Sequence, residues 1–358
     1  MKVLVAPLDW GLGHATRCIP IIYNLLNAGF EVLIAADGHI KKLLEIEFPA
    51  LPFILLEGYR VQYAHSKRAL LYQLLRQVPH ILRIIRHENS WLKEAVIKHK
   101  IDLIISDNRY GLYHPDLHSI FVTHQLLIKT PFLERVLQSF NYLLINKFNE
   151  CWVPDNKEGH TLSGILSHPI MLPSVPVKYI GILSRFNAEP PLSLKQNKIL
   201  ILLSGPEPQR TLLENILTAQ LDIEQDVVII RGLPGEVKTI PNVRNVKFIN
   251  HLPAKKLEKE IKQSSLIIAR AGYSTIMDLI TLKKQSILIP TPGQTEQEYL
   301  GGHLNKNKLA LCVPQEGFNL RNALEKAVLF PYQILGQSPG ELLRAAVNEL
   351  KARKGNAA

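Results

Sequence analysis

Short apolar runs recur along the chain, and each is followed by a polar loop and a segment with helical periodicity. Residues 2–6 (KVLVA) lead through a Gly-rich loop into a helical stretch from about 16 to 28. Residues 198–203 (KILILL) lead through a Gly/Pro loop into a second stretch from about 210 to 220. A buried strand, a Gly-containing loop and a helix open a Rossmann-like unit. The pattern therefore predicts two α/β domains in tandem.

Further apolar runs continue this alternation in both halves. In the first half they lie at 31–35, 101–106, 119–123, 151–154 and 178–180. In the second half they lie at 227–230, 246–249, 266–269, 287–289 and 311–313. Short continuous apolar runs that alternate with helical patterns favour parallel strands covered by helices.

The domain boundaries follow from breaks in periodicity. Residues 183–197 contain a Pro-Pro pair and little periodicity, which predicts a linker between domains at 1–182 and 198–338. Residues 339–358 predict a C-terminal amphipathic helix, for which packing back on the first domain is one option. Ligands of such sheets bind at the carboxyl ends of the strands, so two domains in tandem predict an interdomain cleft.

Composition limits the class of protein. The 358 residues are 46% hydrophobic and 20% charged, which indicates packed globular domains. No run approaches about 18 apolar residues, so we expect no membrane-spanning helix. The three cysteines, Cys18, Cys151 and Cys312, are far apart and suit buried thiols in a reducing cytoplasm rather than a disulfide framework or a zinc site.

The charge balance points to anionic partners. Lys and Arg number 42 against 31 Asp and Glu, a net charge of +11. Aromatic-basic interleaving, a zinc knuckle and a basic tail are all missing from the sequence, so we expect no nucleic-acid partner. Residues 66–100 form a basic amphipathic stretch, read either as a solvated helix face or as a contact with an anionic membrane surface. Its basic residues are Arg68, Arg76, Arg83, Arg86, Lys93 and Lys98.

The first loop carries a candidate base. Gly11 and Gly13 allow a tight turn and close approach to a phosphate or a sugar, but a third glycine is missing, so dinucleotide binding is weakly supported. His14 is either a base near neutral pH or an exposed residue of an ordinary turn. Arg17, one turn further on, either holds an anion or is solvated.

Two other strand ends of the first half carry polar residues. Asp107, Asn108, Arg109 and Tyr110 precede Gly111 and suggest a binding loop. The pair His124–Gln125 ends the next strand, and a structural role for His124 stays open beside a role in the site. These residues should meet the first loop at one sheet edge.

The segment 269–302 brings two helix N-termini to one side of the second predicted sheet, where backbone N–H groups favour an anion. Ser274 and Thr275 are candidates for the N-cap of the first helix. Asp278 is either a ribose ligand or an ordinary first-turn acid. The polar residues Gln294, Gln297 and Glu298 are numerous enough to contact a ribose or a sugar.

The residues Arg270, Gly272, Asp278, Gln297 and Glu298 resemble the donor motif of the family 28 glycosyltransferases, which implies the GT-B fold. In that family the acidic residue binds the donor ribose and a Gln pair contacts the sugar hydroxyls. Asp278 stands where Glu is more usual, and Glu298 where a second Gln is usual. The pair Phe248–Ile249 resembles the segment whose backbone reads the uracil.

Two loops depart from that family. Its Gly-Gly-Ser-Gln-Gly loop is here Ser204–Gly205–Pro206–Glu207–Pro208–Gln209, in which the prolines remove two N–H donors, although Ser204 and Gly205 can still approach a diphosphate. The GxGHxxR form of the first loop is similar to a related nucleotide-sugar hydrolase of pseudaminic acid synthesis, in which the His serves a water nucleophile.

The resemblance implies an inverting, metal-independent transfer of a hexose or N-acetylhexosamine from a UDP-sugar, with no cofactor. The first domain would take a cell-envelope or lipid-linked acceptor, or a polysaccharide, and the second would bind the donor. We expect His14 to be the base, with Asp107 as its rival. We expect a cytoplasmic protein, with peripheral association at the inner face of the cell membrane as one option. The expected acceptor contacts are Gly13, Arg17, Asn108, Arg109, Tyr110, His124 and Gln125. The alternatives are nucleotide-sugar hydrolysis on the same fold and a non-catalytic basic protein that binds membranes or nucleic acid.

Overall fold

The chain forms two compact α/β units in a computed structural model. The structure describes residues 1–59, 67–130, 133–186, 198–221, 225–233, 243, 245–336 and 340–355. One unit comprises Met1–Leu183 with Pro339–Ala358, and the other Ser184–Ser338. Residues 187–197 of the predicted linker lie outside the described residues, as do the side chains of Arg68 and Arg76.

The N-terminal unit is built on a seven-stranded parallel sheet of order β3-β2-β1-β4-β5-β6-β7. The strands are β1 Lys2–Pro7, β2 Glu31–Ala36, β3 Phe53–Leu55, β4 Leu103–Asp107, β5 His118–Val122, β6 Glu150–Val153 and β7 Val177–Tyr179. Six of the seven match runs predicted from the sequence. The strand β3 was missed, because it has only three residues, of which two are partly buried and Leu55 is exposed, so they carry no clear pattern.

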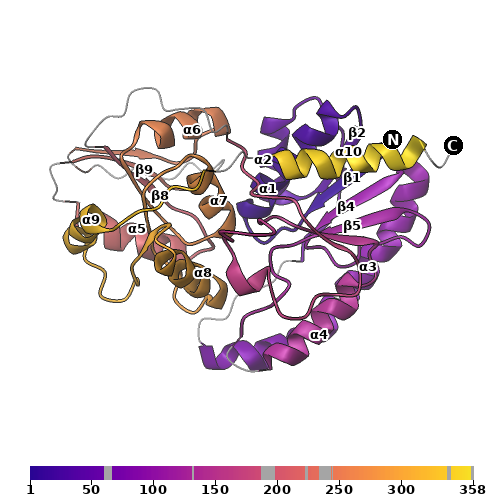
Figure 1. Cartoon of the computed structure of the whole chain (residues 1–358), viewed down its shortest axis with the longest axis horizontal. Coiled ribbons are helices and arrows are strands. Elements are labelled where there is room, and N and C mark those ends of the chain that lie inside the picture. Colours follow the sequence, from indigo (N-terminus) through magenta and orange to yellow (C-terminus); the bar gives the residue numbers. More distant parts are fainter. Residues whose placement is uncertain are drawn as a thin grey trace. The chain divides into compact units, whose positions relative to one another are not determined.

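Helices cover this sheet (Figure 1). They are α1 Leu12–Asn27, α2 Gly38–Glu47, α3 Lys67–His99, α4 Glu134–Ile145, the 3₁₀ turn η1 Gly164–Leu166, and α10 Glu341–Gly355. The C-terminal helix α10 contacts α1 within this unit. Its Leu343 and Val347 are fully buried, and Lys178 of β7 forms an ion pair with Glu349. The last helix of the chain therefore completes the core of the first unit.

The C-terminal unit is built on a six-stranded parallel sheet of order β10-β9-β8-β11-β12-β13. The strands are β8 Lys198–Leu202, β9 Asp226–Ile230, β10 Val246–Ile249, β11 Leu266–Ala269, β12 Ser286–Leu288 and β13 Leu311–Cys312. The helices are α5 Gln209–Thr218, α6 Ala254–Gln263, α7 Tyr273–Thr281, α8 Thr295–Lys306 and α9 Leu320–Leu329. Every one of these strands overlaps a run predicted from the sequence.

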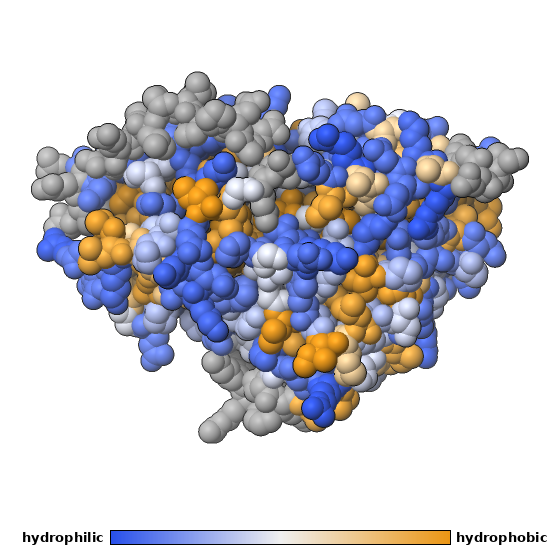
Figure 2. All heavy atoms as spheres, viewed as in Figure 1, coloured by the Kyte–Doolittle hydropathy of each residue, from blue (hydrophilic) through white to orange (hydrophobic). Residues whose placement is uncertain are grey.

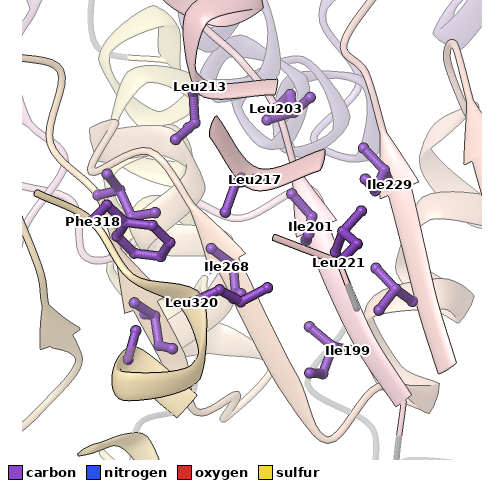
Figure 3. Packing of buried hydrophobic residues seen from close by; sticks show 14 of the residues in the cluster. Ile199, Ile201, Leu203, Leu213, Leu217, Leu221, Ile229, Ile268, Phe318 and Leu320 are labelled. Atoms are coloured by element: carbon purple, nitrogen blue, oxygen red, sulfur yellow. The ribbon is translucent and has the colours of Figure 1, made fainter. Parts of the chain in front are cut away.

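A buried cluster in this unit packs α5 and α9 against the sheet. Leu213 and Leu217 of α5 pack with Ile199 and Ile201 of β8 (Figure 3). Phe318, just before α9, joins the same buried cluster. Burial of leucine and isoleucine side chains of this kind contributes roughly 1.5–3 kcal/mol each, so this contact fixes the start of α5 relative to the end of β8.

In both sheets the strand order reverses beside the first strand of the unit. The strand β1 lies between β2 and β4, and β8 lies between β9 and β11. At such a switch point the loops that follow the two central strands run in opposite directions and leave room for a ligand. In the first unit these are the loops that follow β1 and β4, and in the second the loops that follow β8 and β11.

A buried ion pair joins α3 to the loop after β4. Arg109 is 1% exposed, and its Nε donates to Glu88 Oε1 at 2.7 Å. Its Nη2 donates to the carbonyl of Glu57, and its Nη1 lies 3.4 Å from the carbonyl of Pro7. Glu88 also accepts from the hydroxyl of Tyr59 at 2.8 Å. Arg109 was predicted to bind an acceptor, but its guanidinium is buried and engaged inside the unit.

Gly111 is required by the same ion pair. A Cβ at this position would lie 2.4 Å from the carbonyl of Ile85 and 2.5 Å from Cβ of Glu88, and both belong to α3. The backbone N–H of Gly111 donates to Glu88 at 3.0 Å. The loop after β4 therefore approaches α3 so closely that only glycine fits.

The substitution Glu88→Gln removes the carboxylate that pairs with the buried Arg109. We expect it to lower the free energy of unfolding by about 3 kcal/mol, because a buried cation loses its counter-charge. Urea denaturation followed by circular dichroism measures this loss. The control is Glu94→Gln, which neutralises an exposed residue of the same helix. Equal stability of the two variants would show that Arg109 does not depend on Glu88.

Candidate functional site

His14 and Asp107 meet at the switch point of the first sheet. His14 lies in the first turn of α1, which starts after Gly11, and Asp107 is the last residue of β4. Gly11 has a φ of 104°, a region that only glycine adopts readily. His14 Nδ1 lies 3.1 Å from Asp107 Oδ2. The sequence predicted both residues, and the strand order brings them together.

The carboxylate of Asp107 is fully buried and is paired mainly with Arg17. Arg17 Nη2 donates to Oδ1, and Arg17 Nε lies 3.3 Å from Oδ2. Burial works to raise the pKa of Asp107, but the charges of Arg17 and His14 outweigh it and leave the pKa below its ordinary value. Asp107 is therefore ionised at neutral pH. Its burial argues against its role as a rival base and fits a residue that orients His14.

His124 supports Arg17. Arg17 Nη1 lies 2.9 Å from His124 Nδ1, and arginine has no acceptor, so Nδ1 of a neutral His124 must accept. His124 is 5% exposed, and Arg17 is 3% exposed. Gln125 is half-buried, with its amide nitrogen 3.5 Å from His124 Nε2. His124 and Arg17, both predicted to contact an acceptor, thus form the support behind Asp107.

The other first-unit candidates differ in exposure. Asn108 is half-buried with φ 58°, and the carbonyl of Gly13 accepts from Thr16 Oγ1 at 2.9 Å. The hydroxyl of Tyr110 donates to Asn141 Oδ1 at 2.8 Å, which ties this loop to α4. Trp10, which the sequence analysis did not select, is 42% exposed in the loop before α1. The sequence signal that could have pointed to Trp10 is its position between the first strand and the glycine turn.

In the second unit the donor candidates follow the carboxyl ends of several strands. Ser204 and Gly205 follow β8 and are exposed. Arg270 and Gly272 follow β11, and Gly272 is the N-cap of α7. Parallel strands place these loops at one sheet edge.

Arg270 is a buried cation at this switch point. It is 1% exposed, and burial lowers its pKa to about 10. Its Nη2 donates to the carbonyl of Gln209 at 2.8 Å, and its Nη1 lies 3.3 Å from the carbonyls of Ile289 and Pro290. Arg270 thereby links the loops that follow β8, β11 and β12.

Asp278 of α7 is bound by the segment that opens the second unit. Its Oδ1 accepts from Ser184 Oγ at 2.8 Å, and its Oδ2 from Arg185 Nε at 3.3 Å. Asp278 is 6% exposed, and burial raises its pKa although Arg185 and Ser184 oppose the shift. The charge of Arg185 also helps burial to lower the pKa of His251. Ser184 and Arg185 lie in the predicted linker and carry no local motif, so the sequence gives no sign of their contact with Asp278.

The polar side chains after β12 form hydrogen bonds within the loop that precedes α8. Gln297 Oε1 accepts from the N–H of Thr291 at 3.0 Å, and its amide donates to Gln294 Oε1 at 2.5 Å. Glu298 Oε1 accepts from the N–H of Gly293 at 2.9 Å. These side chains hold the loop before α8 in shape, and Glu298 is exposed.

Two further expectations concern backbone positions. Ser274 and Thr275 are not the N-cap of α7: they lie in its first turn, and Gly272 caps it without a side-chain hydrogen bond. The helix begins at Tyr273, so both hydroxyl residues lie past the cap position. Phe248 is buried in the core, while the carbonyl of Ile249 accepts from the N–H of Arg231 at 2.9 Å.

Among the described residues, no three His, Cys, Asp or Glu side chains come close enough together to hold a metal ion. Within the same residues, no helix combines the length and the apolar character needed to cross a bilayer. All three cysteines are free, and Cys18 and Cys151 are buried.

Comparison with known proteins finds similarity to glycosyltransferases. Residues 200–342 match the glycosyltransferase family 28 C-terminal domain. An uncharacterized glycosyltransferase of Methanosarcina acetivorans is 24% identical over 343 residues, which cover 83% of this chain and 82% of that protein. The UDP-N-acetylglucosamine–N-acetylmuramyl-(pentapeptide) pyrophosphoryl-undecaprenol N-acetylglucosamine transferase of Rhodopseudomonas palustris is 29% identical over 97 residues, 26% of this chain and 24% of that protein.

Solved structures show the same fold. The crystal structure of Acinetobacter baumannii MurG has a TM-score of 0.57 at 15% identity, covering 98% of this chain and 99% of that one. The glycosyltransferase VinC in complex with dTDP has a TM-score of 0.54 at 14% identity, covering 98% of this chain and 94% of that one. The predicted pair of Rossmann-like domains is thus confirmed. The chain is a glycosyltransferase of the GT-B type that resembles the family 28 enzymes and carries their C-terminal domain at residues 200–342.

Proposed function

We propose that this glycosyltransferase moves a hexose or N-acetylhexosamine from a UDP-sugar to a hydroxyl of a cell-envelope or lipid-linked acceptor. The transfer inverts the anomeric carbon and needs no metal ion. The observation that carries the proposal is the contact between His14 Nδ1 and the buried carboxylate of Asp107 at 3.1 Å. A histidine oriented by a buried carboxylate is a suitable general base near neutral pH.

His14 Nδ1 has two polar neighbours, Asp107 Oδ2 at 3.1 Å and Arg17 Nη2 at 3.0 Å. The proposed mechanism uses the tautomer in which Nδ1–H donates to Asp107 Oδ2, as a neighbouring carboxylate favours. In that tautomer the lone pair of Nε2 takes the proton of the acceptor hydroxyl. The acceptor oxygen bonds to the anomeric carbon as the bond to the diphosphate breaks, and UDP leaves with that electron pair.

The second unit would hold the nucleotide. Asp278 has a carboxylate whose orientation is fixed by Ser184 and Arg185, and a carboxylate has about four acceptor sites, so lone pairs remain for ribose hydroxyls. The N-terminus of α7, capped by Gly272, offers backbone N–H groups that stabilise the departing diphosphate without a metal. The VinC complex with dTDP makes thymidine the rival to uridine as the donor nucleoside.

Replacing His14 and Asp278 separates the two roles. We expect His14→Ala to lower kcat by about 10²–10⁴-fold with little change in UDP affinity, because only proton removal is lost. We expect Asp278→Ala to weaken UDP binding about tenfold or more. Turnover assays and thermal shifts with UDP, dTDP and GDP and their sugars measure both effects. The control is His39→Ala, an exposed residue of α2.

The same variants distinguish transfer from hydrolysis. A histidine in this loop could also activate water to hydrolyse the nucleotide sugar. Stoichiometric free sugar from a UDP-sugar without any acceptor, lost in His14→Ala, would replace transfer by hydrolysis. Absence of any thermal shift with the nucleotides, together with full activity of Asp278→Ala, would contradict the donor assignment.

A peripheral membrane position fits two surfaces of the N-terminal unit. Arg83, Arg86, Lys93 and Lys98 of α3 are all exposed. Figure 2 shows small apolar groups that interrupt a mostly hydrophilic face. The exposed apolar residues include Ile170, which is fully exposed, and Met171, whose carbonyl accepts from Tyr142 of α4 at 2.5 Å. Exposed basic side chains favour an anionic lipid surface, where a lipid-linked acceptor would lie, and exposed apolar side chains can add contacts with lipid.

The double substitution Arg83→Glu with Arg86→Glu tests this position. We expect roughly tenfold or greater loss of binding to phosphatidylglycerol-containing vesicles at low salt, because each basic residue near such a surface contributes about 1 kcal/mol. Vesicle co-sedimentation measures it. The control is Lys255→Glu with Lys256→Glu, the same charge reversal on exposed residues of α6. Wild-type protein that does not bind such vesicles would count against a membrane-bound acceptor.

A further inference from the structure

The start of α5 already holds an anion from its own chain. Glu207 Oε2 accepts from the backbone N–H of Thr211 at 3.2 Å, and Glu207 Oε1 accepts from Arg210 Nε at 2.7 Å. The first turn of a helix has unsatisfied N–H groups and a partial positive charge, which is why it binds phosphates. The carboxylate of Glu207 lies where a phosphate would be bound after β8.

Few backbone donors are left at this turn. Pro206 and Pro208 have no N–H, and the N–H of Arg210 donates to the carbonyl of Pro206 at 3.2 Å. The N–H of Thr211 is engaged with Glu207. A phosphate can gain the Thr211 donor and the Nε of Arg210 only by replacing the carboxylate.

Positive charge remains at this turn when Glu207 is in place. Arg270, whose Nη2 reaches the carbonyl of Gln209, pairs with no carboxylate among the described residues, and its buried Nε lacks a hydrogen-bond partner. The buried Oε1 of Gln209 also lacks a partner. Among the described residues, the turn therefore combines the cation of Arg270, which has no carboxylate partner, with Gln209 Oε1, an acceptor that has no donor. An anionic ligand with hydroxyl groups could satisfy both.

The charges beside Glu207 favour the exchange. Glu214 accepts from Arg210 Nη1 at 2.5 Å and from Arg231 Nε at 2.6 Å, so two guanidinium groups share one buried carboxylate. If Glu207 leaves, the guanidinium of Arg210 loses one of its carboxylate partners. The side chain of Glu207 is 45% exposed, so it can turn into water without crossing packed residues.

We propose that Glu207 is an internal occupant of the phosphate position at the start of α5, and that a nucleoside diphosphate displaces it on binding. The inference rests on the proposed function, in which the donor is a nucleotide sugar. Because one anion replaces another, Glu207 weakens the binding of the released nucleoside diphosphate. Weaker product binding favours its release, a step that limits the turnover of many enzymes.

The substitution Glu207→Gln tests the proposal, because it keeps the size of the side chain and removes its charge. Isothermal titration with UDP, dTDP, GDP and inorganic pyrophosphate measures the dissociation constants. We expect binding about three- to tenfold tighter than in the wild type, the range of one partly exposed charge interaction, and no change for uridine. The control is Glu325→Gln, which removes the carboxylate of an exposed residue of α9 in the same unit.

The two proposals fail in different ways. If no nucleotide binds the wild type, the donor assignment fails, and pyrophosphate still decides the role of Glu207. Unchanged or weaker binding of pyrophosphate and nucleotide in Glu207→Gln, or no binding of pyrophosphate to either protein, would overturn the displacement and leave the diphosphate with the start of α7 and without the start of α5. Glu207→Ala, checked for folding by circular dichroism, provides a second variant with the same expected direction.

Discussion

The reversal of strand order beside β1 and β8 is the constraint on which both candidate sites depend. It sets the loop after β1 against the loop after β4, so that His14 reaches Asp107 across 93 residues of sequence. It does the same after β8 and β11, where Arg270 reaches the carbonyl of Gln209. Loops at these positions are free of crossover connections, so polar side chains can gather there without disturbing the apolar layers beneath.

Each switch point contains a buried guanidinium, but the two are compensated differently. Arg17 is neutralised by the carboxylate of Asp107, so the first site is close to neutral and suits proton transfer by His14. Arg270 donates to backbone carbonyls, and burial lowers its pKa to about 10. An uncompensated cation favours an anionic ligand. This difference in charge agrees with a base in the first unit and a diphosphate in the second.

The fold could be predicted from the sequence because its signals are local. Apolar runs identified every strand except β3, and glycine loops marked the starts of α1 and α5. The same local signals selected the candidate residues Asp107 at the end of β4, His14 in the first turn of α1 and Asp278 inside α7. These local signals do not separate a residue that contacts a ligand from one that forms a buried ion pair, because both can stand in a polar loop. Arg109 in a polar loop looks like a ligand contact, although it is the buried partner of Glu88 on α3.

By itself, the sequence determined the order of the elements, the two-domain plan and the loops in which polar residues collect, because short-range periodicity fixes these. Only the tertiary structure decided which charges pair. Arg17 with Asp107, Glu88 with Arg109, and Arg185 with Asp278 each join elements distant in sequence. The physical reason is that the energy of a charge pair depends on distance and burial, and the order of strands in the sheet sets both.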